Sequence, residues 1–433
     1  MNPSDEEKPQ LSRRGFLSRG LLAAATAGLG LKGASVANAA DAPKPDAIPQ
    51  NDIEPFRGEH QGGILTPIQR NTYFAAFDLV STKKADVIKM LQAWTEASER
   101  MAAGQTAQAI ADDISIPATD SAEAMELPPA RLTITFGFGA GLFTKDGKDS
   151  GYGLADLRPA ALVDLPRFNG DQLQDNLTGG DLSVQACSDD PQVAFHAVRQ
   201  LARLADGTAK VRWVQNGFLA NFKTGETPRN LMGFKDGTNN PSTSDPKLMN
   251  KFIWVGDEGP DWMRGGSYLV ARRIRIALEH WDRMNVAFQE QTVGRHKYSG
   301  APLGGAKEFD QADYDATDKD GNSVIAEHSH LRLAASVNND GSQILRRPYS
   351  YNDGANFTAE RWPPWRQDLE YDAGLFFLCY QTDPRTGFIK IFDKMAKFDM
   401  MNQFVTHTGG GLFACPGGIA KGEYIGQRLF EKV

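Results

Sequence analysis

The chain has 433 residues, of which 41 % are hydrophobic and 23 % charged, a composition that supports one or two globular cores and excludes a mainly disordered protein. The formal net charge is -7, and no basic run follows the N-terminal segment, so the charge pattern gives no reason to expect nucleic acid or an anionic membrane as a partner. A small molecule is the expected partner.

The N-terminal segment, residues 1–39, has the composition of an export signal. Ser12–Leu17 contains two consecutive arginines, and Leu21–Leu31 is rich in Ala, Gly and Leu. This apolar run is too short to span a bilayer, and Ala37-Asn38-Ala39 supplies the small residues that signal peptidase accepts. We predict a twin-arginine signal peptide, export of the folded chain to the periplasm, and no stable membrane insertion. An exposed amphipathic helix is the alternative.

Residues 40–56 are rich in Pro, Asp and Ala, which predicts a linker, and residues 57–216 contain a regular order of elements. Alternating apolar residues indicate strands, and apolar residues at helical spacing indicate helices. The order strand, helix, strand, strand, helix, strand is typical of a ferredoxin-like unit with an antiparallel sheet. The six predicted elements are Thr72–Val80, Lys84–Ala103, Arg131–Phe138, Asp181–Cys187, Pro191–Leu204 and Lys210–Gln215.

Residues 217–433 begin with an inter-unit segment rich in Gly and Asn and then repeat this order, which predicts a second ferredoxin-like unit and an α+β fold. Residues 295–342 form an insertion without a strong pattern, which indicates either a functional loop or an element assigned incorrectly. The predicted elements are Ser267–Leu278, His280–Gly294, Gln343–Tyr351, Gly374–Thr382, Gly387–Met401 and Gly411–Cys415.

The three cysteines, Cys187, Cys379 and Cys415, lie in apolar strand-like stretches without any CxxC or CxxCH spacing. This spacing argues against a covalently attached haem and against a structural zinc site. The pattern favours buried free thiols and leaves a disulfide open.

Polar residues gather in three motifs of the second half. The first, Leu231–Pro241, places one acid, Asp236, among glycines that let the backbone approach a ligand closely. An Asp-Gly turn accounts for the same residues. The second, Glu327–Arg332, contains His328 and His330, and a His-x-His pair can bind zinc or non-haem iron. No further ligand lies at a helpful spacing, so two solvated loop histidines are the alternative.

The third motif is a predicted strand, Ile344–Tyr351, that carries two consecutive arginines, Arg346 and Arg347. Consecutive strand residues face opposite sides, so one guanidinium is expected to be buried and to need an anionic partner, while the other is solvated. The pattern does not decide which one is functional.

Together and in this order, the three motifs resemble those of the dye-decolorizing (DyP-type) haem peroxidases, which have Gly-Phe-x-Asp-Gly, then a His, then an Arg-Arg strand. The similarity is to the iron-uptake branch of deferrochelatase/peroxidases and covers residues 56–433. It implies two ferredoxin-like units in the family's dimeric α+β barrel-like architecture, and a homodimer. Further matching stretches are Gly58–Gln61, Gly63–Pro67, Gly300–Leu303 and Gly374–Gln381.

The resemblance also implies one non-covalent haem b per chain, with His330 as the proximal iron ligand, Asp236 as the distal acid and base, and Arg346 as the distal arginine. One stretch differs, because family members often continue His-Ile-Arg-x-Ala-Asn-Pro-Arg after the ligand and this chain does not. Contacts to the haem propionates are therefore not implied. The residues expected to line the porphyrin are Gly237, Thr238 and Asn239, with Leu375 and Phe377 over its distal face.

The implied activity is reduction of hydrogen peroxide with oxidation of small organic reductants such as dyes or phenols. Release of iron from haem with the porphyrin intact, together with partners of an iron-uptake system, is the second expectation. A periplasmic haem carrier without turnover is the alternative, although a carrier needs neither Asp236 nor Arg346. A non-haem His-x-His metalloenzyme is the remaining one.

Overall fold

The structure is a computed structural model that describes residues 52–220, 222, 226–359 and 367–432. The predicted signal peptide, residues 1–39, and most of the predicted linker, residues 40–56, lie outside the described residues. Among the described helices, none is long and apolar enough to cross a membrane.

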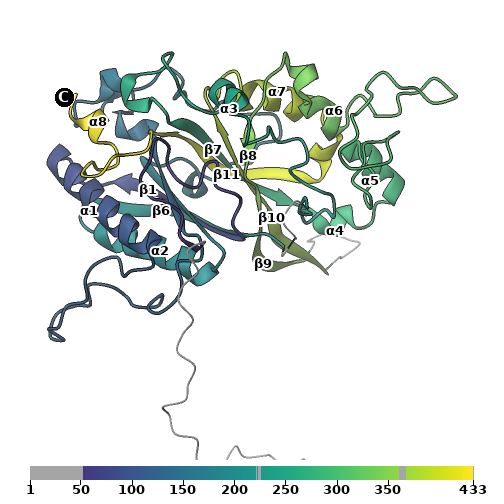
Figure 1. Ribbon diagram of the computed structural model, residues 1–433. Coiled ribbons are helices and arrows are strands. Elements are labelled where there is room, and N and C mark those ends of the chain that lie inside the picture. The colour runs from purple at the N-terminus through teal and green to yellow at the C-terminus, as the bar shows by residue number, and fades with distance from the viewer. Residues whose placement is uncertain (1–51, 221, 223–225, 360–366, 433) are drawn as a thin grey trace, which may run out of the picture. The chain divides into compact units, whose positions relative to one another are not determined.

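The first half of the fold follows the predicted order of elements. Its four antiparallel strands pair in the order β2-β5-β1-β6, with two helices packed on the sheet. In Figure 1, α1 and α2 lie together on this part of the sheet. The elements are β1 (Asn71–Leu79), α1 (Lys84–Ala102), β2 (Thr133–Gly139), β5 (Leu182–Ser188), α2 (Pro191–Leu204) and β6 (Ala209–Phe218); between β2 and β5 lies a short hairpin of β3 (Thr144–Lys145) and β4 (Lys148–Asp149).

Both helices of this unit form where the sequence pattern places them, for local reasons. α2 begins with Pro191, which needs no intrahelical donor, and the side chain of Asp190 accepts hydrogen bonds from the first free backbone N–H groups. Trp94 of α1 is buried against Phe77 of β1, and its indole N–H donates to the carbonyl of Leu201 at 2.8 Å. Burial of one such large side chain contributes roughly 1.5–3 kcal/mol.

The second half repeats the topology, with strands in the order β11-β7-β10-β9 and α7 as its long helix. The elements are α3 (Pro246–Phe252), β7 (Ser267–Ile276), α4 (Leu278–Trp281), α5 (Val286–Val293), α6 (His330–Ala334), β8 (Leu345–Arg346), β9 (Tyr349–Ala359), β10 (Gln367–Gln381), α7 (Phe388–Phe398), β11 (Val405–Cys415) and α8 (Gln427–Phe430).

Two predicted elements of this half are each divided in the structure. The predicted helix His280–Gly294 is two helices, because Asn285 has extended backbone and its side chain caps α5 by accepting from the N–H of Phe288 at 2.9 Å. The predicted strand Gln343–Tyr351 is interrupted between β8 and β9 at Pro348, which has no N–H to donate to a ladder.

The predicted ends of other elements were wrong as well. The predicted helix Gly387–Met401 ends at Phe398, since Asp399 is extended and its side chain caps a following 3-10 turn, Met400–Gln403. β11 begins at Val405 instead of the predicted Gly411, because a register shift and a run of glycines hide its first half from the periodicity. The insertion 295–342 contains α6, so it is partly an element that the pattern missed.

The two sheets join into one barrel-like sheet, which confirms the predicted α+β fold of two ferredoxin-like units. β11 pairs with β2 on one side and β6 with β9 on the other, and β10 pairs with both β9 and β7, so the ring of strands closes. Aromatic side chains from both units meet in the interior, where the Phe74 ring lies 4.9 Å from Trp213 and 5.4 Å from Phe376 between ring centroids.

Side-chain alternation on β10 separates this interior from the functional face of the molecule. Phe376 points into the barrel, and its neighbours Leu375 and Phe377 therefore point outward. Outside the barrel, these two side chains, α6 and α7 and the segment between the two units enclose one cavity.

Candidate active site

The cavity outside β7, β10 and β11 has a volume of about 680 Å³, within the usual range for small-molecule sites. Most of its wall is apolar, and polar groups are concentrated on two opposite sides. This distribution suits a large apolar ligand that is oriented by a few polar contacts. The main apolar lining residues are Phe234, Ile274, Leu375, Phe377, Phe388, Phe392 and Met395.

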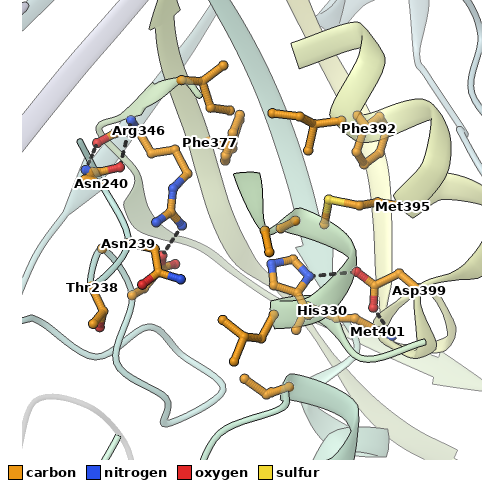
Figure 2. A pocket seen from close by; sticks show the side chains of 18 of the residues that line it. Thr238, Asn239, Asn240, His330, Arg346, Phe377, Phe392, Met395, Asp399 and Met401 are labelled. Atoms are coloured by element: carbon orange, nitrogen blue, oxygen red, sulfur yellow. Dashed lines mark hydrogen bonds and ion pairs between the residues drawn. The ribbon is translucent and has the colours of Figure 1, made fainter. Parts of the chain in front are cut away.

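On one side, His330 is the first residue of α6, and Asp399 orients its ring. Nδ1 lies 2.7 Å from Oδ2 of Asp399, whose side chain is only 2 % exposed and also accepts from the N–H of Met401 at 2.8 Å. A carboxylate at this distance makes Nδ1 the donor, which leaves the lone pair on Nε2. Figure 2 shows the ring between Asp399 and the open part of the cavity.

Electrostatics at His330 reflect two opposing effects. Burial lowers the pKa of His330, but the charge and the hydrogen bond of Asp399 outweigh it, so the pKa is raised above its ordinary value. An imidazole with one nitrogen held by a carboxylate and the other facing a cavity is the usual arrangement of a metal-ligating histidine, whose partner fixes the ring and raises its basicity.

On the opposite side, Asp236 and Arg346 form an ion pair, with Nη1 of the guanidinium 3.2 Å from Oδ1 of the carboxylate. Asp236 precedes Gly237, whose φ of +123° requires glycine. Asn240 fixes this segment to β8, because its side chain accepts from the backbone N–H of Arg346 at 3.1 Å and donates to the carbonyl at 2.8 Å. The pair is therefore held from two distant parts of the sequence.

The structure brings together all the site residues that the resemblance implied. Thr238 and Asn239 line the same side of the cavity as Asp236, and Leu375 and Phe377 enter it from β10. Thr238 directs its hydroxyl toward Glu308 of the insertion, to which it donates at 3.0 Å. Figure 2 shows Asn239 and Arg346 across the cavity from His330.

The second histidine and the second arginine of these motifs, His328 and Arg347, do not line the cavity. Arg347 faces the barrel interior, is 4 % exposed, and donates to the carbonyl of Thr66 and, at 2.7 Å, to Oε1 of Gln69. His328 is not among the residues that line the cavity, and its ring lies 5.8 Å from that of Phe398. The strand alternation thus selects Arg346.

Several polar residues of the cavity were not predicted from the sequence, and three of them are charged or titratable groups that hold other parts of the site: Asp399, Arg295 and His407. Asp399 was assigned to a helix, and Arg295 lies in the insertion that showed no pattern. His407 lines the cavity from β11 and accepts from Nε of Arg272 at 3.0 Å; burial and this cation hold the pKa of His407 well below its ordinary value. Only for Asp399 did a signal exist, since Asp is common at the start of a helical turn, where its side chain accepts from free N–H groups.

The chemistry of these groups fits a planar tetrapyrrole with a central iron. One imidazole nitrogen is free on one side, the walls are apolar, and an acid paired with a permanent cation lies opposite. His330 would hold such an iron from one side, and the polarity of the groups on the other side would then decide its reactivity. The fit depends on residues that are far apart in the sequence.

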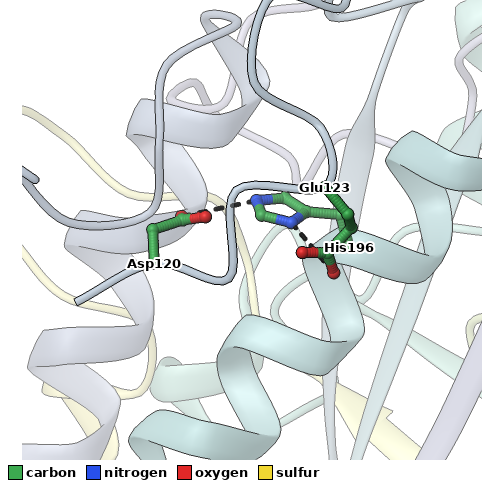
Figure 3. A group of neighbouring side chains, drawn as sticks. All are labelled: Asp120, Glu123 and His196. Atoms are coloured by element: carbon green, nitrogen blue, oxygen red, sulfur yellow. Dashed lines mark ion pairs between the residues drawn. The ribbon is translucent and has the colours of Figure 1, made fainter. Parts of the chain in front are cut away.

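A second histidine and carboxylate group lies outside the cavity (Figure 3). On α2, His196 places Nε2 3.4 Å from Oδ2 of Asp120 and Nδ1 3.2 Å from Oε1 of Glu123. Asp120 also accepts from the backbone N–H of Ala107 at 2.7 Å. One ligand atom from each of the three side chains lies within 4.8 Å of the others, but the two carboxylates contact different ring nitrogens. The group, called the clamp below, ties α2 to the loop after α1.

Comparisons with known proteins agree with this reading of the fold and cavity. Models of the N-terminal and C-terminal regions of the Dyp-type peroxidases match residues 61–219 and 227–420. A deferrochelatase from Yersinia pseudotuberculosis is 35 % identical over 443 aligned positions, which cover 99 % of this chain and 97 % of that protein. One from Escherichia coli O6:K15:H31 is 36 % identical over 396 positions, or 89 % of each chain.

Solved structures give the same result. A DyP-type peroxidase from Streptomyces coelicolor superposes with a TM-score of 0.78 at 39 % identity, covering 88 % of this chain and 98 % of that one. Ferric DtpA from Streptomyces lividans has the same TM-score, identity and coverage. The chain therefore belongs to the Dyp-type peroxidase family.

Proposed function

We propose that the protein binds one non-covalent haem b per chain through His330 and reduces hydrogen peroxide on the side of Asp236 and Arg346. The observation that carries the proposal is the opposition of the His330–Asp399 pair and the Asp236–Arg346 pair across one apolar cavity. Family membership supports the peroxidase activity, and small organic molecules are the proposed reductants.

Bound ferric haem would supply the redox chemistry and bind the peroxide. Asp236 is placed to accept a proton from the peroxide and to return it to the outer oxygen, so that water is the leaving group. Arg346 is a permanent cation at 3.2 Å from this carboxylate, and it offsets the negative charge that develops as the O–O bond breaks. Asp399 keeps His330 in one tautomer and one orientation.

We propose release of iron from haem, with the porphyrin left intact, as a second activity of the same cavity. Its support is the likeness to proteins named deferrochelatase, at 35 % identity over nearly the whole chain. Asp236 and Arg346 favour turnover over the alternative of a haem carrier, because a carrier has no use for a paired acid and cation opposite its ligand.

The test is the absorption and fluorescence of the exported protein incubated with haem. We expect a Soret band that changes on addition of peroxide, and free-base porphyrin emission that grows under reducing conditions if iron is released. A Soret band that is unaffected by peroxide would favour the carrier. Absence of any Soret band would overturn haem binding and return attention to a non-haem metal.

The proposed location is the periplasm, reached by twin-arginine export of the folded chain, with a homodimer as the proposed assembly and iron-uptake proteins as proposed partners. The motif Arg13-Arg14 before the apolar run supports export. Changing both arginines to lysine should retain the protein in the cytoplasm, measured by cell fractionation. Light scattering of the purified protein tests the dimer.

A further inference from the structure

Arg295, directly after α5, is a second cation in the cavity wall, and it is almost fully buried at 7 % exposure. Its Nη1 donates to the carbonyls of Gly300 at 2.7 Å and Glu308 at 3.0 Å, and its Nη2 donates to Oδ1 of Asn239 at 3.2 Å. Within the described part of the chain no carboxylate forms an ion pair with it. Its hydrogen bonds therefore serve to hold the cavity wall.

This contact fixes the orientation of the Asn239 amide. A guanidinium only donates hydrogen bonds, so the amide must turn its carbonyl oxygen toward Arg295 and its NH₂ group away from it. None of the described residues accepts a hydrogen bond from that NH₂ group, and Asn239 lines the cavity. In Figure 2, Asn239 lies beside Arg346 and across the cavity from His330.

The segment that carries Asn239 is anchored at further points. Glu308 of the insertion accepts from the hydroxyl of Thr238 at 3.0 Å and pairs with the ammonium group of Lys235. Burial raises the pKa of Glu308, but its hydrogen bonds to Lys235, Thr227 and Thr238 outweigh burial, so the pKa lies below its ordinary value and the anchor is anionic. With several anchors on either side of Asn239, the amide has little freedom to turn.

We infer that Asn239 is a third hydrogen-bond donor to the molecule bound between Asp236, Arg346 and the haem iron, and that Arg295 is the positioning residue that orients its amide. The inference rests on the proposed function and adds a specificity-determining residue to it. The acceptor that such a donor recognises is the oxygen of a peroxide or a small anion on the Asp236 side; a carboxylate of the tetrapyrrole would be the other source of an acceptor.

The experiment measures fluoride affinity of the haem-loaded full-length protein by absorption titration, since fluoride binds ferric haem and accepts hydrogen bonds from neighbouring donors. Asn239→Ala should weaken fluoride binding roughly five-fold, the effect of one lost hydrogen bond. Asn239→Asp keeps the size and gives Arg295 an anionic partner, and it should weaken binding more than about ten-fold because an acceptor replaces the donor. Asn322→Ala, on the exposed part of the insertion, should bind fluoride like the wild type.

A double-mutant cycle tests the part played by Arg295. Arg295→Met should weaken fluoride binding by about the same factor as Asn239→Ala. The double variant should bind no more weakly than either single variant, because both changes remove the same donor, the NH₂ group of Asn239. Additive effects, or an unchanged affinity in Arg295→Met, would overturn the positioning role. If Arg295→Met does not fold, Arg295→Leu, which also lacks a donor, replaces it, and the same comparison with Asn239→Ala applies.

Two further outcomes separate the alternatives. Wild-type fluoride affinity in both Asn239 variants would overturn the donor role. The Asn239 variants could instead lose affinity for haem but not for its dimethyl ester, with fluoride binding unchanged. This result would assign the amide to a tetrapyrrole carboxylate and would also overturn the donor role. Absence of a Soret band in the wild type would instead refute the proposed function itself, and with it this inference.

Discussion

Two regions of the molecule contain a histidine beside a carboxylate, and they differ in what is left for a ligand. His196 has both ring nitrogens engaged, by Asp120 and Glu123, and its side chain is 5 % exposed. His330 has one nitrogen engaged by Asp399 and is 35 % exposed, toward a cavity of about 680 Å³. Both histidines lie beside carboxylates, so residue type alone does not show which one could bind a metal. The difference is the second ring nitrogen, which is engaged in His196 and, among the described residues, free in His330.

The largest effect on activity is expected from Asp236, which lies across the cavity from His330 and has no equivalent beside His196. Asp236→Asn keeps the size of the side chain but removes the proton acceptor, so the rate of peroxide reduction should fall about 10²–10⁴-fold while haem stays bound. Stopped-flow absorption with peroxide and a haem titration measure the two quantities separately. Reaction at the wild-type rate would remove Asp236 from its assigned role.

Removal of each histidine sharpens the comparison directly. His330→Ala should weaken haem binding by more than about 100-fold, since even the loss of an outer partner of a ligating histidine costs about 10–100-fold. His196→Ala is the matched control, and it should bind haem like the wild type because both ring nitrogens of His196 are engaged by side chains outside the cavity. Equal haem affinities in the two variants would contradict the assignment of the ligand.

A smaller effect on haem binding is expected from a change of Asp399, the carboxylate that holds Nδ1 of His330. Asp399→Asn keeps a hydrogen-bonding group near Nδ1 but removes the charge, so haem affinity or turnover should fall about ten-fold. The Soret position and the iron–histidine stretching frequency by resonance Raman spectroscopy report the change at the imidazole. Unchanged spectra and affinity would show that Asp399 only caps the turn that follows it.

The smallest effect concerns the clamp and acid stability. Burial raises the pKa of Glu123, but hydrogen bonds and the charge of His196 lower it more, to about 2. A carboxyl group with a lowered folded-state pKa stabilises the fold above its unfolded-state pKa and loses that contribution as the pH falls through the folded-state value. Glu123→Gln should therefore lower the free energy of unfolding by on the order of 2 kcal/mol at neutral pH.

The pH dependence distinguishes this mechanism from simple loss of packing. The difference between the wild type and Glu123→Gln should shrink between about pH 4 and pH 2, measured by denaturant unfolding. Glu126→Gln, an exposed neighbour in the same loop, is the control and should show no such difference. A difference that is constant across this range would mean that the carboxylate charge of Glu123 contributes nothing.

The sequence alone determined the order of elements, because helices and half-buried strands carry their periodicity in neighbouring residues. α1, α2 and β7 lie where the pattern placed them, and the breaks occur where a local cap or a proline overrides the apolar spacing, at Asn285 and Pro348. The motifs around Asp236, His330 and Arg346 could be found as candidates, but their chemistry came from a resemblance and not from their spacing.

Only the tertiary structure decided which polar groups meet. Asp399 is 69 residues from His330, and Arg346 is 110 residues from Asp236, so no local pattern relates the members of either pair. Arg346 faces the cavity and Arg347 the barrel interior because of the way β8 pairs with β10. The orientation of Asn239 depends on Arg295, which lies in an insertion without periodicity. These contacts arise from long-range strand pairing and packing, which the order of residues along the chain does not display.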